Sequence, residues 1–538
     1  MIVAIGFAFL LAAPALALDA GSLKFGGEYR VRGFSHSNVN LDENDATDAY
    51  YDMRLRVKAT YNVTDNITLT TRFDALDRTW GTDKGDDNNI ENIDFKDAFL
   101  TIKTPLGGFI IGRYPTTNFG TGLYDSSNDK DRIIYVLPIA NWTFAGVLQK
   151  EGEYDKGTKV ADADNEKYSV VTQYKGKNFT AGALLAVYNY KTVPSPLQLD
   201  EFVLNYGAYK AAVDAANLAS ATLGGTIDAA LAGGIPQAAI DNDLATPGAT
   251  LAAYGIPDLN ALANDADAKT GQATYAGSLI SSGSPETYEV FAWVPEAFFK
   301  GKFGGFGIEA EIDYATGTGE NATDGKEDLD ATLLEYLAEV SYETGPFAIR
   351  GGYVSMSGDE NPYDTDVKCA AYFERSANLD KTFILTGNDG DGRVGAGLET
   401  TLGGYGTVAA GEVASFLNPA VRAGINMLYA GVTYSPLENL SFDFVYANAK
   451  ADEVAETILI PDGSGGGNVM NRNDIGLGSI DDDMGNEYDF TVTWKCLGNL
   501  EYKFVAAYLD AGDFWKQGDD SVDLENLYTF YNSLTLTF

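Results

Sequence analysis

The sequence predicts an all-β fold, a transmembrane antiparallel β-barrel of about eighteen strands, with sixteen also possible. Three observations predict it. Segments of ten or so residues alternate apolar and polar side chains, the links between them are alternately short and long, and the last segment runs in alternation to Phe538. A closed barrel pairs every strand on both edges, so no backbone polar group faces hydrocarbon unpaired.

The alternation is clearest in residues 51–61. Apolar and polar side chains take turns there, in the order Tyr51, Asp52, Met53, Arg54, Leu55, Arg56, Val57, Lys58, Ala59, Thr60, Tyr61. Because successive side chains of a strand point to opposite faces, one face is apolar and the other is charged. The pattern returns in residues 67–74, 306–314, 488–496 and 500–508. Such segments exceed the roughly five or six residues of a usual strand in a soluble sandwich and suit a tilted membrane strand.

The links between these segments fall into two classes of length. The short ones are 63–66, 105–108, 175–177, 301–305, 343–346, 435–439 and 497–499. The long ones are 36–49, 79–92, 116–130, 191–286, 315–331, 358–420, 450–486 and 511–525. Outer-membrane barrels have short periplasmic turns and long extracellular loops, so both termini are expected in the periplasm. Residues 358–420 leave room for a further hairpin.

Residues 1–17 are expected to be a signal peptide, since an apolar run at 1–11 precedes the small-residue site Ala15-Leu16-Ala17. This run is shorter than the ~20 residues of a membrane-spanning helix. Residues 18–538 then form the barrel. The Ala- and Gly-rich insertion at 191–286 is expected to be an extracellular loop that constricts the pore, caps its mouth, contacts a neighbouring subunit or is simply solvated.

Charge and motifs argue against most other functions. The net charge of −40 excludes nucleic acid as a partner. The single histidine, His36, is expected in a loop near a rim, and no zinc, Ser-His-Asp, G-x-S-x-G or Walker motif occurs. Glu309 and Glu311 suit a glycosidase in principle, but they indicate first a lumen face, so no catalytic residue and no cofactor are predicted. The acidic runs 388–392 and 481–483 lack the EF-hand ligand set, so no metal site is predicted.

Two further residue types fit the same arrangement. Cys369 is expected in an extracellular loop and Cys496 near a periplasmic turn, too far apart for a disulfide. The tryptophans predict two aromatic belts, with Trp142 and Trp494 near the periplasmic turns and Trp80 and Trp515 near the outer loops.

A charge at the lipid midplane costs ~2–4 kcal/mol, so the charged residues of the strands are expected to line the pore. The basic set is Arg30, Arg32, Arg54, Arg56, Lys58, Arg72, Arg113, Arg132 and Arg350. The acidic set is Glu309, Glu311, Asp313, Glu335, Glu339 and Asp443. Two interpretations remain open. Either the basic and acidic walls produce a field across the pore, or these charges pair with one another and keep the lumen wet.

Three short tracts, 111–114, 119–122 and 129–135, resemble segments of Gram-negative porins from anaerobic deltaproteobacteria. The architecture is more distantly similar to that of alginate-export-type barrels. The resemblance implies an outer-membrane channel through which small hydrophilic solutes diffuse passively, with membrane lipid as a partner, as a monomer or a homotrimer. The alternatives are a substrate-specific or polysaccharide-export channel, and a scaffold for a periplasmic or surface partner.

The C-terminal segment resembles the sorting signal that the barrel-assembly machinery reads. Phe538, Leu536 and Leu534 occupy one face of this segment, with the aromatic residue last. The resemblance implies that these three residues are the assembly signal.

Overall fold

The structure, a computed structural model, describes the following parts of the chain: residues 23–38, 41, 47–81, 93–115, 119–121, 123, 129–153, 164–194, 226–227, 287–321, 328–361, 365–368, 379, 381–386, 423–461, 467–472, 478–516, 518 and 523–538. The expected signal peptide, Cys369, the acidic run 388–392 and nearly all of the insertion lie outside these residues.

Eighteen long strands form one sheet, whose nineteenth member is a two-residue strand. The long strands are β1 (Leu23–Ser37), β2 (Asp48–Thr64), β3 (Ile67–Thr79), β4 (Ile93–Thr104), β5 (Gly107–Tyr114), β6 (Lys130–Ile139), β7 (Trp142–Gly152), β8 (Asn165–Lys175), β9 (Phe179–Pro194), β10 (Thr287–Phe303), β11 (Phe306–Asn321), β12 (Leu329–Thr344), β13 (Phe347–Met356), β15 (Ile425–Leu437), β16 (Leu440–Lys450), β19 (Asp483–Leu497), β20 (Leu500–Ala511) and β21 (Leu527–Thr537).

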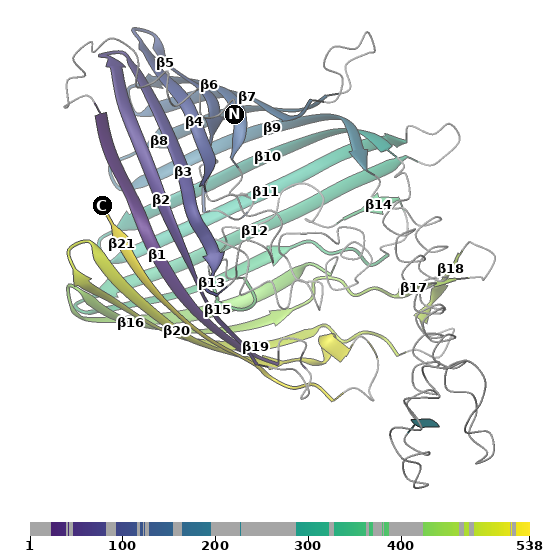
Figure 1. Ribbon diagram of the computed structural model, residues 1–538. Helices are drawn as coiled ribbons and strands as arrows, with labels where there is room; N and C mark the ends of the chain where they lie inside the picture. The colour runs from purple at the N-terminus through teal and green to yellow at the C-terminus, as the bar shows by residue number, and fades with distance from the viewer. Residues whose placement is uncertain are drawn as a thin grey trace, which may run out of the picture. The chain divides into compact units, whose positions relative to one another are not determined.

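Each long strand pairs with the next one along the chain, and β21 returns to pair antiparallel with β1 (Figure 1). At this seam Gly27 and Phe538 exchange two backbone hydrogen bonds, of 2.8 and 3.0 Å. The short strand β14 (Asp366–Val367) lies parallel to β12 and takes no part in the closure. The prediction of a closed, antiparallel, eighteen-stranded barrel is therefore confirmed.

The connections sort by length between the two rims, because an antiparallel chain changes rim at every strand. Links of two or three residues, such as Asp65–Asn66 and Gly304–Gly305, occupy one rim, while the long connections occupy the other. Two links escaped the sequence analysis, the turn Ala140–Asn141 and the connection 153–164. The expected long loop at 315–331 is shorter than predicted, since β11 continues to Asn321 and β12 begins at Leu329.

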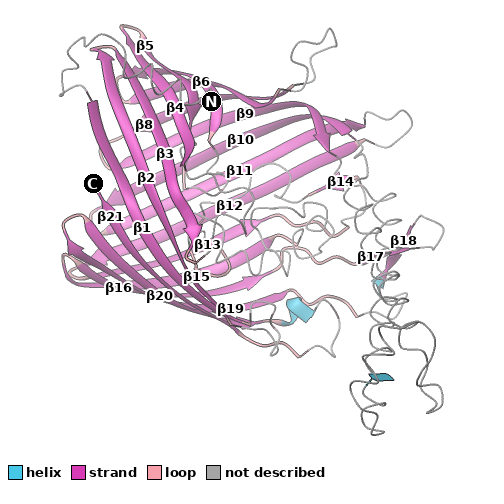
Figure 2. Ribbon diagram, viewed as in Figure 1, coloured by secondary structure: helices cyan, strands magenta, loops and turns pink. Residues whose placement is uncertain are grey.

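The two faces of the sheet differ sharply in character. On β11, Ile312 has 52% of its surface exposed on the outside, whereas the adjacent Asp313 is 0% exposed on the inside. This apolar-out, polar-in order is the reverse of a soluble fold and matches a barrel surrounded by hydrocarbon. Among the described residues the barrel is built of strands, and a single turn of 3-10 helix, Asp513–Lys516, follows β20 (Figure 2).

Outward-facing aromatic rings stack across neighbouring strands. Near the rim with the short turns, Phe306 contacts Tyr342 and Phe347 contacts Tyr434, with ring centroids 4.6 and 4.8 Å apart. A second run crosses β16, β19, β20 and β21 and consists of Tyr446, Tyr488, Tyr508 and Tyr528. Such rings anchor a barrel at the bilayer interfaces.

Trp80, Trp142 and Trp494 are exposed as the aromatic belts require. Trp515 lies at the rim with the long connections, as expected, but it does not belong to a belt: it is only 8% exposed, and its indole N–H donates to the carbonyl of Met484 at 2.8 Å. The 3-10 turn that follows β20 carries the ring into the barrel's interior cluster, away from the lipid.

The largest buried apolar cluster combines inward side chains of the barrel with residues of the long connections. The strands contribute residues such as Phe34 and Met427, and the connections contribute Leu41, Leu123 and Ile384. Together with Ile480 and Phe514 of two further connections, these residues show that described parts of five connections pack against inward side chains of the barrel.

A second compact unit comprises residues 194–287 and 457–475. Its described part includes the antiparallel hairpin of β17 (Thr457–Pro461) and β18 (Gly467–Asn471). Among the described residues, no helix is long and apolar enough to cross a membrane.

Candidate functional site in the barrel lumen

The basic residues predicted on the first strands do point inward. Arg32 of β1 and Asp52 of β2 are register partners, and the guanidinium donates to both carboxylate oxygens at 2.9 and 2.5 Å. Their side chains are 0% and 3% exposed. This pair is the most deeply buried ion pair on this wall of the lumen.

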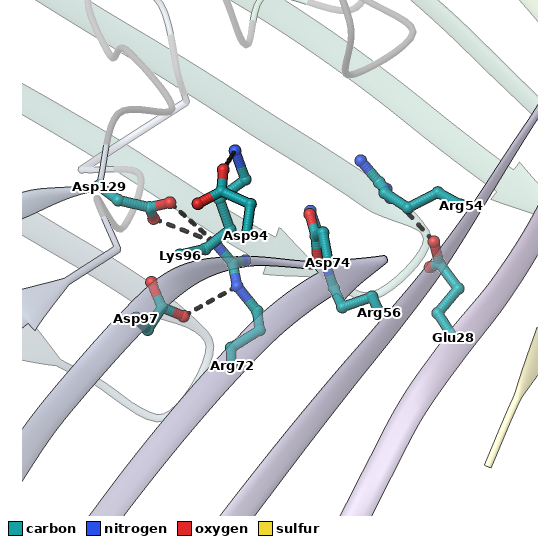
Figure 3. A network of polar contacts seen from close by, with 9 residues as sticks. All are labelled: Glu28, Arg54, Arg56, Arg72, Asp74, Asp94, Lys96, Asp97 and Asp129. Carbon is teal, nitrogen blue, oxygen red and sulfur yellow. Dashed lines mark hydrogen bonds and ion pairs between the residues drawn. The ribbon is translucent and has the colours of Figure 1, made fainter. Parts of the chain in front are cut away.

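The same pattern continues around the wall (Figure 3). Arg54 binds Glu28 at 3.3 Å, and Arg56 binds both oxygens of Asp74 at 2.8 Å. In Figure 3 the guanidinium of Arg72 lies between two carboxylates. It contacts Asp97 of β4 at 2.9 Å and Asp129 at 3.0 Å, just before β6.

On this wall, the observed pairing fits the interpretation in which the charges neutralise one another. The six predicted basic residues lie among five acidic ones that the sequence analysis left unassigned, namely Glu28, Asp52, Asp74, Asp97 and Asp129. A nearly balanced wall produces little net field. Arg30 shares the inward face of β1 with Arg32. Lys58 of β2 is exposed to the lumen.

The three further predicted arginines do not all face the lumen. Arg350 of β13 binds both oxygens of Asp443 at 2.8 Å, and Arg132 of β6 donates through Nε to the buried Gln149, so both face inward.

Arg113 does not line the pore. It shares the outer face of β5 with the exposed Ile111, and its partner there is Asp131, at 3.8 Å. Arg113 stands at the end of its strand, where a lipid-facing charge costs only ~0–1 kcal/mol, so the midplane argument for an inward position fails for it.

The acidic wall is formed by β10, β11 and β12. Glu311, Asp313 and Glu335 are inward and buried, as predicted. Asp313 is the register partner of Glu335 on one side and of Glu296 on the other. Glu296 was missed because the preceding inward residues of β10, such as Ala292 and Val294, are apolar like its outward residues. Alternation therefore did not identify the inward face of this strand.

The other predicted acidic residues also lie on the inner face. Glu339 accepts hydrogen bonds from Tyr429 at 2.6 Å and from Lys381 at 3.0 Å. Glu309 is half-buried and is the register partner of Lys300. Asp443 is paired with Arg350, as described above.

Two connection segments reach across the lumen. In the first, Thr121 donates both its backbone N–H and its hydroxyl to Glu311, and Phe119 packs edge-on against Phe298 of β10 with ring centroids 4.9 Å apart. In the second, residues 381–386, the backbone N–H groups of Ile384 and Leu385 donate to Glu487 of β19. No sequence pattern indicated that these segments turn inward, since irregular loops carry no periodicity.

His36 is not a loop residue, in contrast to the prediction. It lies on β1 near its end, is 6% exposed, and its Nδ1 is 3.2 Å from the hydroxyl of Thr529 across the barrel seam. Cys496 is a free thiol near a short turn, as expected.

Comparison with known proteins gives the following. No family model and no curated protein matches the chain. Among solved structures, a BenF-like porin from Pseudomonas fluorescens Pf-5 is similar over 97% of this chain and 100% of its own, with 10% identity and a TM-score of 0.44. OccK8 (OprE) of Pseudomonas aeruginosa is similar over 96% and 98%, with 8% identity and a TM-score of 0.43. OmpT of Vibrio cholerae, a trimer form, is similar over 96% and 99%, with 10% identity and a TM-score of 0.38.

The fold itself is defined by the strand pairing of this chain. A closed antiparallel barrel with an apolar outer face and a charged interior is the form in which strands span a bacterial outer membrane. The chain has the architecture of an outer-membrane β-barrel.

Proposed function

We propose that this protein is an outer-membrane channel that lets small hydrophilic solutes or ions diffuse passively through a charged lumen. The observation that carries the proposal is the inversion of polarity across one closed sheet, with Ile312 outside and Asp313 inside. Charges are kept inside a barrel only where water or partners compensate them, and conduction needs such a lumen. The short-turn rim would face the periplasm.

The charges support a preference for cations. The wall of β1–β4 is nearly neutral through its own ion pairs. The wall of β10–β12 carries seven acidic residues on its inward register against three lysines described near them, Lys300, Lys302 and Lys381. A pore whose wall carries an excess of negative charge concentrates cations.

Neutralising the basic wall is expected to increase cation selectivity. In the double variant Arg54→Gln with Arg56→Gln, Glu28 and Asp74 lose their partners and add negative potential to the pore. The reversal potential across a planar bilayer in a KCl gradient measures the effect.

The matched control is Arg113→Gln, which removes the same charge from the outer face. We expect this variant to keep the wild-type reversal potential. If the double variant also keeps it, the assignment of Arg54 and Arg56 to the conducting path is contradicted.

The inward connection segments favour the substrate-specific form of the channel over an open one. They bring Phe119 and Thr121 against β10 and β11, and residues 381–386 against β12 and β19. A narrowed lumen predicts saturable block of the conductance by the solute that the channel carries. A scaffold, in contrast, would conduct little alone and would co-purify with its partner.

The proposal extends to membrane lipid around the apolar face and to recognition by the assembly machinery. Leu534 and Phe538, two of the three residues of the expected assembly signal, are exposed on the outer face of β21 and at its end. There they would be accessible to an assembly factor in the membrane. The chain is compatible with a monomer or a homotrimer.

A further inference from the structure

Three carboxylates on the inner face of β10 and β11 lie close enough to share one cation. An oxygen of Glu296, one of Glu311 and one of Asp313 all lie within 4.8 Å of one another. Two oxygens on opposite sides of a calcium ion, each about 2.3–2.6 Å from it, are separated by about as much. The three side chains are 6%, 3% and 0% exposed.

A fourth buried carboxylate, Glu335, supports the presence of a cation at this cluster. Glu335 is the register partner of Asp313, is 0% exposed, and neither of its oxygens has a hydrogen-bond partner in the structure. The negative charges of Glu311 and Glu296 act on it from close by. An ionised carboxylate buried among others without a hydrogen-bond partner costs several kcal/mol, so such a group either takes up a proton or is compensated by a cation.

Several carboxylate oxygens at this point have no hydrogen-bond partner in the structure. Thr121 occupies one oxygen of Glu311, Oε2, while the other, Oε1, is buried without a hydrogen-bond partner. Both oxygens of Glu335 and this one of Glu311 therefore lack a hydrogen-bond partner, next to the three mutually close carboxylates. Lys300 faces Glu309 in register, two residues from Glu311.

We propose that Glu296, Glu311, Asp313 and Glu335 form a calcium site in the wall of the lumen. Calcium takes six to eight oxygen ligands in flexible geometry, and carboxylates with a few waters supply them. Magnesium fits less well, because it demands near-octahedral geometry and retains most of its water. The bound ion links three neighbouring strands and, through Glu311 and Thr121, secures the connection between β5 and β6.

The test uses the full chain, folded in detergent, stripped with EDTA and then titrated with CaCl₂. Calcium is expected to raise the thermal unfolding midpoint of the wild type, since a ligand that binds only the folded state stabilises it. Glu335→Gln is expected to weaken this calcium effect about tenfold or more in concentration, because calcium affinity follows the number of ligand charges. The variant is expected to fold, because it removes a buried repulsive charge and keeps the side-chain shape.

The matched control is Glu309→Gln, on the same face of β11 but outside the cluster, which is expected to keep the wild-type calcium response. Any binding of calcium to acidic loops is the same in both variants, so it does not affect the comparison between them. Two outcomes overturn the site. In the first, the thermal unfolding midpoint of the wild type does not change with calcium. In the second, Glu335→Gln and the wild type respond equally to calcium. Binding is measured without conduction, so either result is independent of the channel proposal.

Discussion

Replacing Asp52 with alanine is expected to lower the free energy of unfolding by about 3–5 kcal/mol, because it leaves a buried cation without its partner. Arg32 is completely buried and binds both oxygens of Asp52. Water reaches Arg32 poorly. In the variant, only nearby polar groups and the ring of Phe34, 5.0 Å away, would stabilise its charge. Reversible unfolding by guanidinium chloride from lipid vesicles measures the loss.

Two variants test the explanation. Asp131→Ala removes an ion pair of the same chemistry on the outer face, where the carboxylate is 67% exposed, and should cost no more than about 1 kcal/mol. Replacing both partners, Arg32→Met with Asp52→Leu, should recover most of the loss, since a buried pair is often replaceable by apolar side chains. A double variant as unstable as Asp52→Ala would mean that packing, and not the orphaned charge, causes the loss.

Ile312→Arg is expected to destabilise the folded barrel by about 2–4 kcal/mol, the cost of an arginine on the lipid face at the bilayer midplane. Ile312 is 52% exposed on the outer face of β11, six residues from the start of the strand at the short-turn rim. The same guanidinium unfolding experiment in lipid vesicles measures the change.

The control is Thr318→Arg, on the same face of the same strand but nearer the rim with the long connections. A charge at the interface costs only ~0–1 kcal/mol, so this variant should resemble the wild type. Equal costs at residues 312 and 318 would argue that this face of β11 does not meet hydrocarbon at all.

The fold was largely predictable because the alternation of apolar and polar side chains is a signal contained within a single strand. Residues 51–61 alternate without interruption, and the structure places them on β2 with Arg54 inside and Tyr51 outside. The signal fails where both faces have similar polarity, as on β10, and this is why Glu296 was missed. It fails also at strand ends, where the energetic penalty for an outward charge vanishes, as Arg113 shows.

The site was less predictable than the fold because it depends on pairing between strands. The sequence shows that Arg72 faces the lumen, but its partners Asp97 and Asp129 come from β4 and from a loop before β6. Whether a charge is neutralised is decided by register and by which loops turn inward. The sequence therefore left the field and the paired charges as open alternatives on the basic wall. It assigned the acidic residues of β11 and β12 to the inner face, but it did not show that they meet Glu296 of β10.

The seam between β1 and β21 has a consequence for biogenesis. It joins residues as far apart as His36 and Thr529, 493 positions along the chain. During synthesis β1 emerges early and has to wait for β21, with its free edge open to pairing with other chains. Premature aggregation in the periplasm is the hazard of this topology, and an escort that shields that edge is what the nascent polypeptide requires.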